Sequence, residues 1–381
     1  MSRCSVRYCA GRAARVSARS WSSSDRAVVA RRNLHRHRFH RGVQVRLPNQ
    51  RGPVSEILIR AFHHPPEAED ESALEAISAS EIESLSDEDL QLSLFLCYGL
   101  QYCLFGETAQ HWEWETSLIG LRKRLEVRFA RELRETAGQL PVVDVEKLPE
   151  FLMDLGKPSP GRSLSRYLKQ DATMEQFQEF LMHRSVYSLM EADHHSLVIP
   201  RVRGGGKPAL VEIQADEYGG GIPGRLHSQL FELTLNELGM LTEFGSYFED
   251  VPACSLTTVN VISYFGTYGR HRGAMLGNLA MTEIGSHYVN RNFRNGLQRL
   301  NGSDDSWLFF QEHIVADAVH EQLAAYDMCG RFVRDNPREV SDMVFGAVVT
   351  AELGARANEH MLSSWERGES SLRGAASVAA G

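Results

Sequence analysis

Apolar residues recur at helical spacing over most of the chain after about residue 86. From Leu118 to Leu133 they follow one another every three or four positions, with charged residues between them. The mainly apolar run from Leu90 to Phe105 is preceded by Ser-Asp-Glu-Asp at 86–89, which is typical of a helix N-terminus. The pattern therefore predicts two helices before residue 136.

A proline-rich stretch follows these two helices. Residues 141–161 contain four prolines and two glycines, which favours a linker. Beyond it, the apolar spacing predicts helices at about 173–192, at 209–219 with a continuation toward 238, and at 256–293, 307–333 and 338–365. Strand character is confined to the short run from Leu197 to Ile199, which Pro200 ends. The predicted fold is an all-α bundle.

Charge divides the chain sharply. Residues 1–60 hold fourteen Arg, no Lys and two acids, a net of +12, so the other residues carry −20 and the whole chain −8. We expect a disordered basic leader at 1–64, an N-terminal helical module at 65–140, a linker at 141–160, a larger helical domain at 161–367 and a disordered tail at 368–381. The leader resembles a transit peptide or a nucleic-acid-binding arm, but a dispensable tail or a start codon placed too far upstream explains it more simply.

Composition narrows the functional classes. The 381 residues are 43% hydrophobic and 24% charged, as expected for a globular chain with a sizeable core. No window reaches the roughly 18 to 20 uninterrupted apolar residues that a membrane-spanning helix needs. The six cysteines lack CxxC pairing, and no secretory signal is recognisable, so neither disulfides nor a thiolate zinc site is indicated. We expect a reduced, soluble, cytoplasmic protein with no membrane partner, and the acidic body disfavours nucleic acid.

The sharpest chemical pattern lies in the helix predicted at 307–333. His313, Asp317 and His320 occupy positions i, i+4 and i+7, which fall within about 60° of one another on a helix. Two imidazoles and a carboxylate then point in one direction. Burying such a stripe in an apolar bundle is costly unless a metal or polar partners accept it, which favours a metal site.

A second cluster surrounds three consecutive glycines at 219–221. Glu217 precedes them and His227 follows them. In one straight helix these two side chains would lie about 15 Å apart and about 80° out of phase, so they would not share an ion. Two alternatives remain: they serve two different ions, or a distortion at the glycines draws them together.

Two further carboxylates complete the candidate set. Glu283 follows small and apolar residues on a predicted long helix, where an unpaired buried acid would be unfavourable. Glu191 lies at the end of the preceding helical segment, in the sequence Glu191-Ala-Asp-His194. On spacing alone, each is compatible with a ligand, a surface acid or an ion-pair partner.

These residues together resemble the haem-oxygenase-like di-iron oxidases, a family also described as iron-containing redox enzymes. The similarity extends from about Asp89 to Trp365 and rests on Glu191-Ala-Asp-His194, the segment from Glu212 to Gly221, His227, Glu283 and the HxxxDxxH run from His313 to His320. It implies a haem-oxygenase-like helical bundle, preceded here by the smaller N-terminal helical module, that holds two non-haem iron ions instead of porphyrin.

The resemblance also assigns roles to residues. It implies metal ligands at Glu217, His227, Glu283, His313, Asp317 and His320, with Glu191 as the additional carboxylate of the nitrogen-oxygenating subgroup and Asp216 orienting an imidazole. No catalytic residue beyond the ligands is assigned. The implied cofactors are two Fe(II)/Fe(III) ions without haem, with O2 as co-substrate and an external electron donor. The segment before Pro141 is similar to a region associated with dimerisation, which predicts a homodimer.

The implied activity is O2-dependent oxidation of a small amine or amino-acid-like metabolite through a peroxo-di-iron(III) intermediate, with N-oxygenation favoured because Glu191 is present. Desaturation or C–C cleavage of fatty or amino acids uses similar ligands and is the alternative reaction. A ferritin-like bundle would need a second ExxH sequence besides Glu191 to His194. Haem oxygenase needs one proximal histidine and no ring of acids. A non-catalytic iron-binding or helical interaction protein is the alternative from another class.

Overall fold

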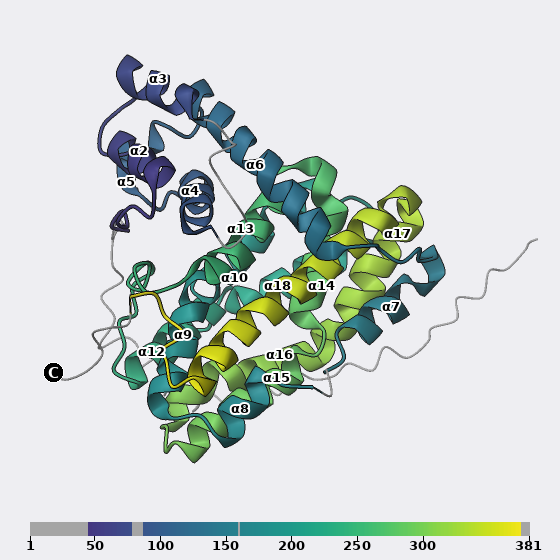
Figure 1. Ribbon diagram of the computed structural model, residues 1–381. Helices are drawn as coiled ribbons and strands as arrows, with labels where there is room; N and C mark the ends of the chain where they lie inside the picture. The colour runs from purple at the N-terminus through teal and green to yellow at the C-terminus, as the bar shows by residue number, and fades with distance from the viewer. Residues whose placement is uncertain (1–44, 78–86, 159–160, 375–381) are drawn as a thin grey trace, which may run out of the picture. The chain divides into compact units, whose positions relative to one another are not determined.

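The structure is a computed structural model that describes residues 45–77, 87–158 and 161–374 (Figure 1). Within these ranges all regular elements are helical, which confirms the all-α prediction. The predicted leader up to residue 44 and the end of the tail lie outside the described residues. Among the helices of the described ranges, none combines the length and the apolar character required to cross a bilayer.

The N-terminal helices pack on one another, and α4 joins them to the central helix α13 (Ala253–Thr267). They are α2 (Pro53–Ala61), α3 (Ala68–Ala76), α4 (Glu88–Gly99), α5 (Gly106–Gln110) and α6 (Thr116–Ala137). Asp89 ties α4 to α2, because its two carboxylate oxygens accept the backbone N–H groups of Val54 and Ser55 at 2.8 and 2.7 Å. Asn260 of α13 donates to the backbone oxygen of Gln91 at 2.8 Å. One apolar cluster accordingly continues from these helices into the following ones.

Two boundaries differ from the sequence prediction. Helix α2 begins at Pro53, inside the stretch predicted as a disordered leader, and buries Val54 and Leu58. Helix α7 (Leu148–Leu155) occupies the predicted linker at 141–160 and buries Leu148 and Leu152. In each case the proline stands in the first helical turn, where its missing N–H is not needed, so it marks a helix start instead of a loop. The division into domains otherwise stays a prediction.

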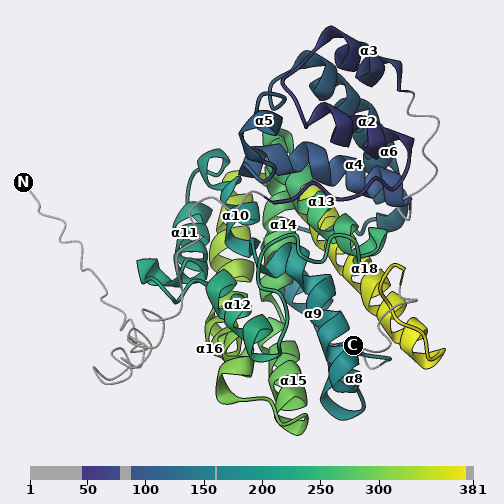
Figure 2. The ribbon, with the colours of Figure 1, turned by 90° about the vertical axis from the view of Figure 1, so that its left-hand side faces the viewer.

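The remaining helices form the bundle that holds the candidate ligands. They are α8 (Leu164–Gln170), α9 (Met174–Ser188), α10 (Glu191–Ser196), α11 (Gly206–Glu217), α12 (His227–Glu237), α13 (Ala253–Thr267), α14 (Arg272–Glu283), α15 (Ser286–Arg299), α16 (Leu308–Gln322), α17 (Arg331–Asp335) and α18 (Val340–Glu366). A π-helical segment, η8 (Leu323–Gly330), joins α16 to α17. Figure 2 shows α10, α11, α12 and α16 beside one another, and contacts join α10 to α11 and α12 to α16.

The long helix predicted at 256–293 is divided into α13, α14 and α15. Gly285 separates the last two with φ of 77°, a left-handed conformation that favours glycine. A Cβ at this position would also lie 2.6 Å from the backbone oxygen of Gly156. The break makes Glu283 the last residue of α14 instead of a mid-helix residue, and so fixes where its carboxylate points.

Helices α14 and α18 pack against each other at unusually short range (Figure 1). A Cβ on Gly346 would lie 2.0 Å from the backbone oxygen of Ala274, and one on Gly277 would lie 2.2 Å from that of Met343. The two helices therefore approach through glycines, because any larger side chain at these positions meets backbone atoms. This contact sets the position of α14, the helix that carries Glu283.

We expect Gly346→Ala to lower the free energy of unfolding by about 1–3 kcal/mol, because the added methyl group forces α18 away from α14. Gly354→Ala, in the same helix with no atom within 4 Å of the new Cβ, is the matched control. It should raise stability by about 0.5–1 kcal/mol through backbone entropy alone. Urea unfolding of both variants measures the difference, and equal stability of the two would contradict the close-packing interpretation.

Candidate metal centre

The seven candidate ligands come from five helices, and all of them are buried. The first residue of α10, the last of α11 and the first of α12 supply three of them, the last of α14 supplies a fourth, and α16 supplies the other three. In chain order they are Glu191, Glu217, His227, Glu283, His313, Asp317 and His320. Residues separated by up to 129 positions in the sequence thus meet in one interior region of the bundle.

The triple glycine forms a tight turn between α11 and α12. Gly219, Gly220 and Gly221 all adopt positive φ, at 65°, 61° and 73°. This conformation is readily accessible only to glycine, and it reverses the chain within a few residues. Glu217 Oε2 and His227 Nδ1 are consequently 2.8 Å apart. Of the two alternatives left open by the sequence, the structure shows the distortion that draws these side chains together.

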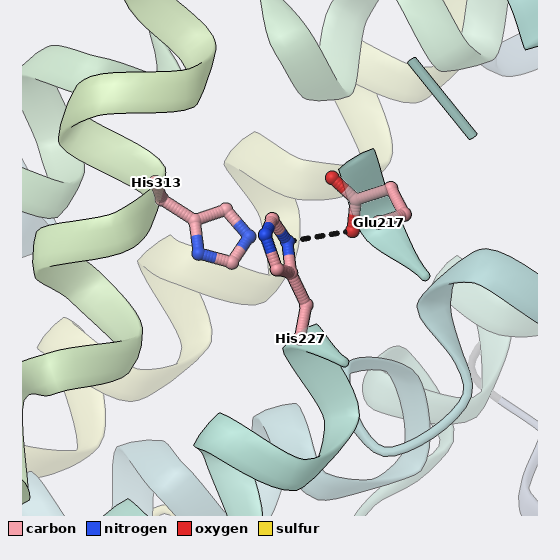
Figure 3. A group of neighbouring side chains, drawn as sticks. All are labelled: Glu217, His227 and His313. Atoms are coloured by element: carbon pink, nitrogen blue, oxygen red, sulfur yellow. Dashed lines mark ion pairs between the residues drawn. The ribbon is translucent and has the colours of Figure 1, made fainter. Parts of the chain in front are cut away.

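One group of candidate ligands consists of Glu217, His227 and His313 (Figure 3). One donor atom from each lies within 4.8 Å of the others, and the two imidazole centroids are 4.3 Å apart. His313 Nδ1 donates to the backbone oxygen of Phe309 at 2.8 Å, which leaves Nε2 free to face the group. That Nε2 atom lies 4.0 Å from Glu191 Oε2, so Glu191 borders the same group.

A second group consists of Glu217, Glu283 and His320, again within 4.8 Å of one another. His320 Nδ1 lies 3.1 Å from Glu283 Oε2 and 3.6 Å from Asp317 Oδ1. Its other nitrogen, Nε2, donates to Asp216 Oδ2 at 3.0 Å. Asp216 is more than half exposed and stands outside the group, where it fixes the imidazole tautomer. Glu217 is the residue common to both groups.

Several donor atoms at this site are buried without a hydrogen-bond partner. They are Glu191 Oε2, Glu217 Oε2, His227 Nδ1, His313 Nε2 and both carboxylate oxygens of Asp317. Glu217 Oε2 and His227 Nδ1 are included although they lie 2.8 Å apart, because their relative orientation does not suit a hydrogen bond. Each buried polar atom without a partner costs free energy, and six of those among the described residues lie together at this site. Imidazole nitrogens and carboxylate oxygens are suitable ligands for iron, so the residues fit the metal.

Electrostatics at the centre also favour a cation. Burial, together with neighbouring charges, raises the pKa of Glu217 well above its usual range and that of Glu283 to about 8. Burial lowers the pKa of His227. For His320 burial acts downward as well, but the nearby carboxylates of Asp216, Asp317 and Glu283 prevail and raise its pKa to about 12. Burial thus opposes negative charge on Glu217 and Glu283, and cations bound among these carboxylates would favour their charged, ligating form.

Two residues next to candidate ligands, His194 and Tyr218, lie outside both groups. His194 completes the ExxH sequence that begins at Glu191, yet its ring lies edge-on to Tyr102 at 4.9 Å and joins neither group. Tyr218 directs its hydroxyl to Asp193 and Ser196 at 2.8 and 2.9 Å, as expected for a packed tyrosine. The ExxH geometry of a ferritin-like site is therefore not formed here.

Tyr187 is a site residue that sequence reasoning missed. Its hydroxyl donates to Glu191 Oε1 at 2.8 Å, and the bond spans the junction of α9 and α10. The other oxygen of the carboxylate, Oε2, is thereby left facing His313. Burial raises the pKa of Tyr187 well above 10, so the phenol keeps the proton that it donates. The i, i+4 spacing was the available signal, but a tyrosine on a helix near an acid is too common to single out.

Comparison with known proteins finds a family match for this region. Residues 178–355 match the family described as iron-containing redox enzyme, and this segment contains all seven candidate ligands. The match confirms the resemblance noted in the sequence.

A further similarity concerns one curated protein. Over 113 residues the chain is 29% identical to a nitrosourea synthase from Streptomyces achromogenes subsp. streptozoticus. The aligned part covers 30% of this chain and 24% of that relative, about a quarter of its length.

Replacing His313 or Asp317 by alanine should remove at least one iron ion per chain after reconstitution with Fe(II), because each deletes a buried donor that has no alternative partner. His360→Ala is the matched control, since this exposed histidine of α18 bonds only to the backbone oxygen of Ser371. Iron is measured per chain by elemental analysis. Full iron content in the His313 and Asp317 variants would show that these residues of α16 are not metal ligands.

Tyr187→Phe should weaken iron binding about tenfold, the lower end of the effect of losing a group that orients a ligand. The ring is kept, but Glu191 Oε1 loses its donor and the carboxylate is free to rotate. Tyr102→Phe is the control, because its hydroxyl lies 3.3 Å from Ser263 Oγ and does not contact a candidate ligand. Anaerobic Fe(II) titration measures both variants, and an unchanged affinity for Tyr187→Phe would show that Glu191 needs no such support.

Proposed function

We propose that this chain is a non-haem di-iron oxidoreductase that uses O2 to oxidise a small amine or amino-acid-like metabolite, with N-oxygenation as the favoured reaction. The observation that carries the proposal is the position of Glu217, which belongs to both groups of candidate ligands. A carboxylate has two oxygens, so one glutamate can serve two adjacent cations. The family's description as iron-containing redox enzymes supports the metal and the reaction class.

Charge supports two divalent ions instead of one. The centre buries four carboxylates, those of Glu191, Glu217, Glu283 and Asp317, against three imidazoles. Four negative charges in an apolar interior would be strongly unfavourable alone, and two divalent cations balance them. Each group then offers both nitrogen and oxygen donors, the mixture typical of redox-active iron.

The surrounding side chains hold and shield this centre. Asp216 and the backbone oxygen of Phe309 each accept a hydrogen bond from an imidazole. The other ring nitrogens, Nδ1 of His320 and Nε2 of His313, therefore face the centre. The Phe309 ring lies 4.3 Å from that of His313 and 5.1 Å from that of Phe231, which keeps bulk water from this side. Bound Fe(II) would supply the electrons that begin the reduction of O2.

Two observations favour N-oxygenation. Glu191 borders the group of His227 and His313, where the resemblance places the additional carboxylate of nitrogen-oxygenating relatives. One similar segment comes from a protein whose name states that it makes a nitrosourea. Converting an amine N–H to N–OH with O2 releases the second oxygen atom as water and consumes two further electrons and two protons. The proposed reaction therefore requires an external two-electron donor.

The test reconstitutes the full chain with Fe(II), counts iron, and follows O2 uptake with a chemical reductant and a panel of amines, amino acids and fatty acids. We expect about two iron ions per chain, a transient visible absorption on mixing with O2, and a product heavier by one oxygen atom. Labelling with ¹⁸O2 should place that atom on nitrogen. Asp317→Ala serves as the inactive control.

Other results of these measurements would support one of the alternative functions. Loss of two hydrogens or release of a carbon fragment would indicate the desaturase or C–C lyase. Iron binding without O2 uptake on any substrate would favour a non-catalytic iron-binding protein. A stoichiometry of one iron would contradict the shared role of Glu217.

A further inference from the structure

A groove at some distance from the candidate metal centre gathers basic side chains. Two cavities of about 420 and 400 Å³ share Ala130, Arg134 and Tyr264 in their walls, so they adjoin. The walls come from α6, the end of α13, the short helix η6 (Gly269–His271) and the start of α18. We refer to these joined cavities as the α6–α18 groove. Their size is that of a small-molecule site.

Four exposed cations line the groove, and among the described residues none of them forms a close ion pair with a carboxylate, although the charge of Arg270 acts on Glu126. Lys123 and Arg134 lie on α6, and Arg338 lies just before α18. Arg270 lies 4.0 Å above the ring of Tyr268, and its Nε donates to His271 Nε2 at 3.2 Å. Cations that line one concave surface together raise its local potential and attract anions.

The two acids in the groove are already engaged. Glu126 accepts the hydroxyl protons of Tyr98, at 3.0 Å, and of Tyr268, and burial raises its pKa. Asp342 accepts the backbone N–H of Ala274 at 2.7 Å and lies 3.5 Å from His271 Nδ1. Their carboxylates are therefore directed at protein groups, and the open space of the groove keeps a positive field. That sign is opposite to the net −20 carried by the chain after residue 60.

The remaining walls are flat and largely apolar. Tyr264, Tyr268 and Phe345 contribute rings, and Leu140 contributes an aliphatic side chain. Ser341 adds a hydroxyl donor beside Arg338. Rings beside guanidinium groups suit a ligand with an apolar, planar part and an anionic end, because stacking and charge-assisted hydrogen bonds then act together.

We propose that the α6–α18 groove binds a small organic anion with a planar apolar part and a phosphate or carboxylate group. This ligand is distinct from the substrate of the metal centre. Helix α14 starts at Arg272, next to the groove residue His271, and ends at Glu283, which places about 17 Å of helix between the two sites. No wall residue of the groove belongs to the candidate ligand groups.

The experiment titrates the full chain with phenyl phosphate by calorimetry, with and without reconstituted iron. Benzoate and inorganic phosphate are run in parallel, and benzamide is the neutral control. We expect phenyl phosphate to bind with one site per chain regardless of iron, and benzamide not to bind. A preference for phenyl phosphate or for benzoate identifies the anionic group that the groove selects.

Variants locate the binding. Arg134→Gln and Arg338→Gln should each weaken phenyl phosphate binding about tenfold, with unchanged melting temperature and iron content. Arg131→Gln is the matched control, since Arg131 lies on the same helix but pairs with Glu135 at 3.7 Å. The proposal is overturned if none of the anions binds, if binding requires iron, or if Arg131→Gln weakens binding as much as Arg134→Gln.

Discussion

The structure depends on one physical constraint, which is the burial of four carboxylates and three imidazoles in a helical interior. Six donor atoms there lack any hydrogen-bond partner, including both oxygens of Asp317. A helical bundle gains stability from apolar packing, so a polar cluster of this size would oppose folding unless its charge is compensated. Bound cations would supply that compensation, and the stability of the bundle would then depend on its metal content. The rest of the fold holds the donors close enough for this to occur.

Local chain geometry positions the donor side chains, and three backbone features contribute to it. The positive-φ turn at Gly219–Gly221 brings Glu217 to His227, and the break at Gly285 ends α14 at Glu283. The close glycine contact between α14 and α18 then fixes the position of α14 in the bundle. Directly after the ligand stripe of α16, the chain becomes π-helical over Leu323–Gly330, a distortion often found next to functional sites. Glycines and a π-helical segment thus occur next to the candidate ligands.

Much of this arrangement was predictable from the sequence, and the remainder has identifiable physical reasons. The stripe of His313, Asp317 and His320 is a property of one helix, so its spacing alone places three side chains on one face. The approach of Glu217 to His227 depends on three backbone angles, which spacing does not determine. The bond from Tyr187 to Glu191 has the common i, i+4 spacing, which does not single it out, and the end of α14 depends on Gly285 and its close approach to Gly156. Helix α7 was missed because Pro149 stands in its first turn, where proline is compatible with a helix.

The candidate metal centre and the α6–α18 groove carry side chains of opposite charge, so they attract different ligands. Four acids are buried together at the candidate metal centre, where their field attracts cations, while the α6–α18 groove exposes cations at the other end of α14. An anion entering the acidic centre would meet repulsion until metal is bound, whereas the groove attracts anions at any metal content. Because the two sites prefer ligands of opposite charge, occupation of one does not compete with occupation of the other.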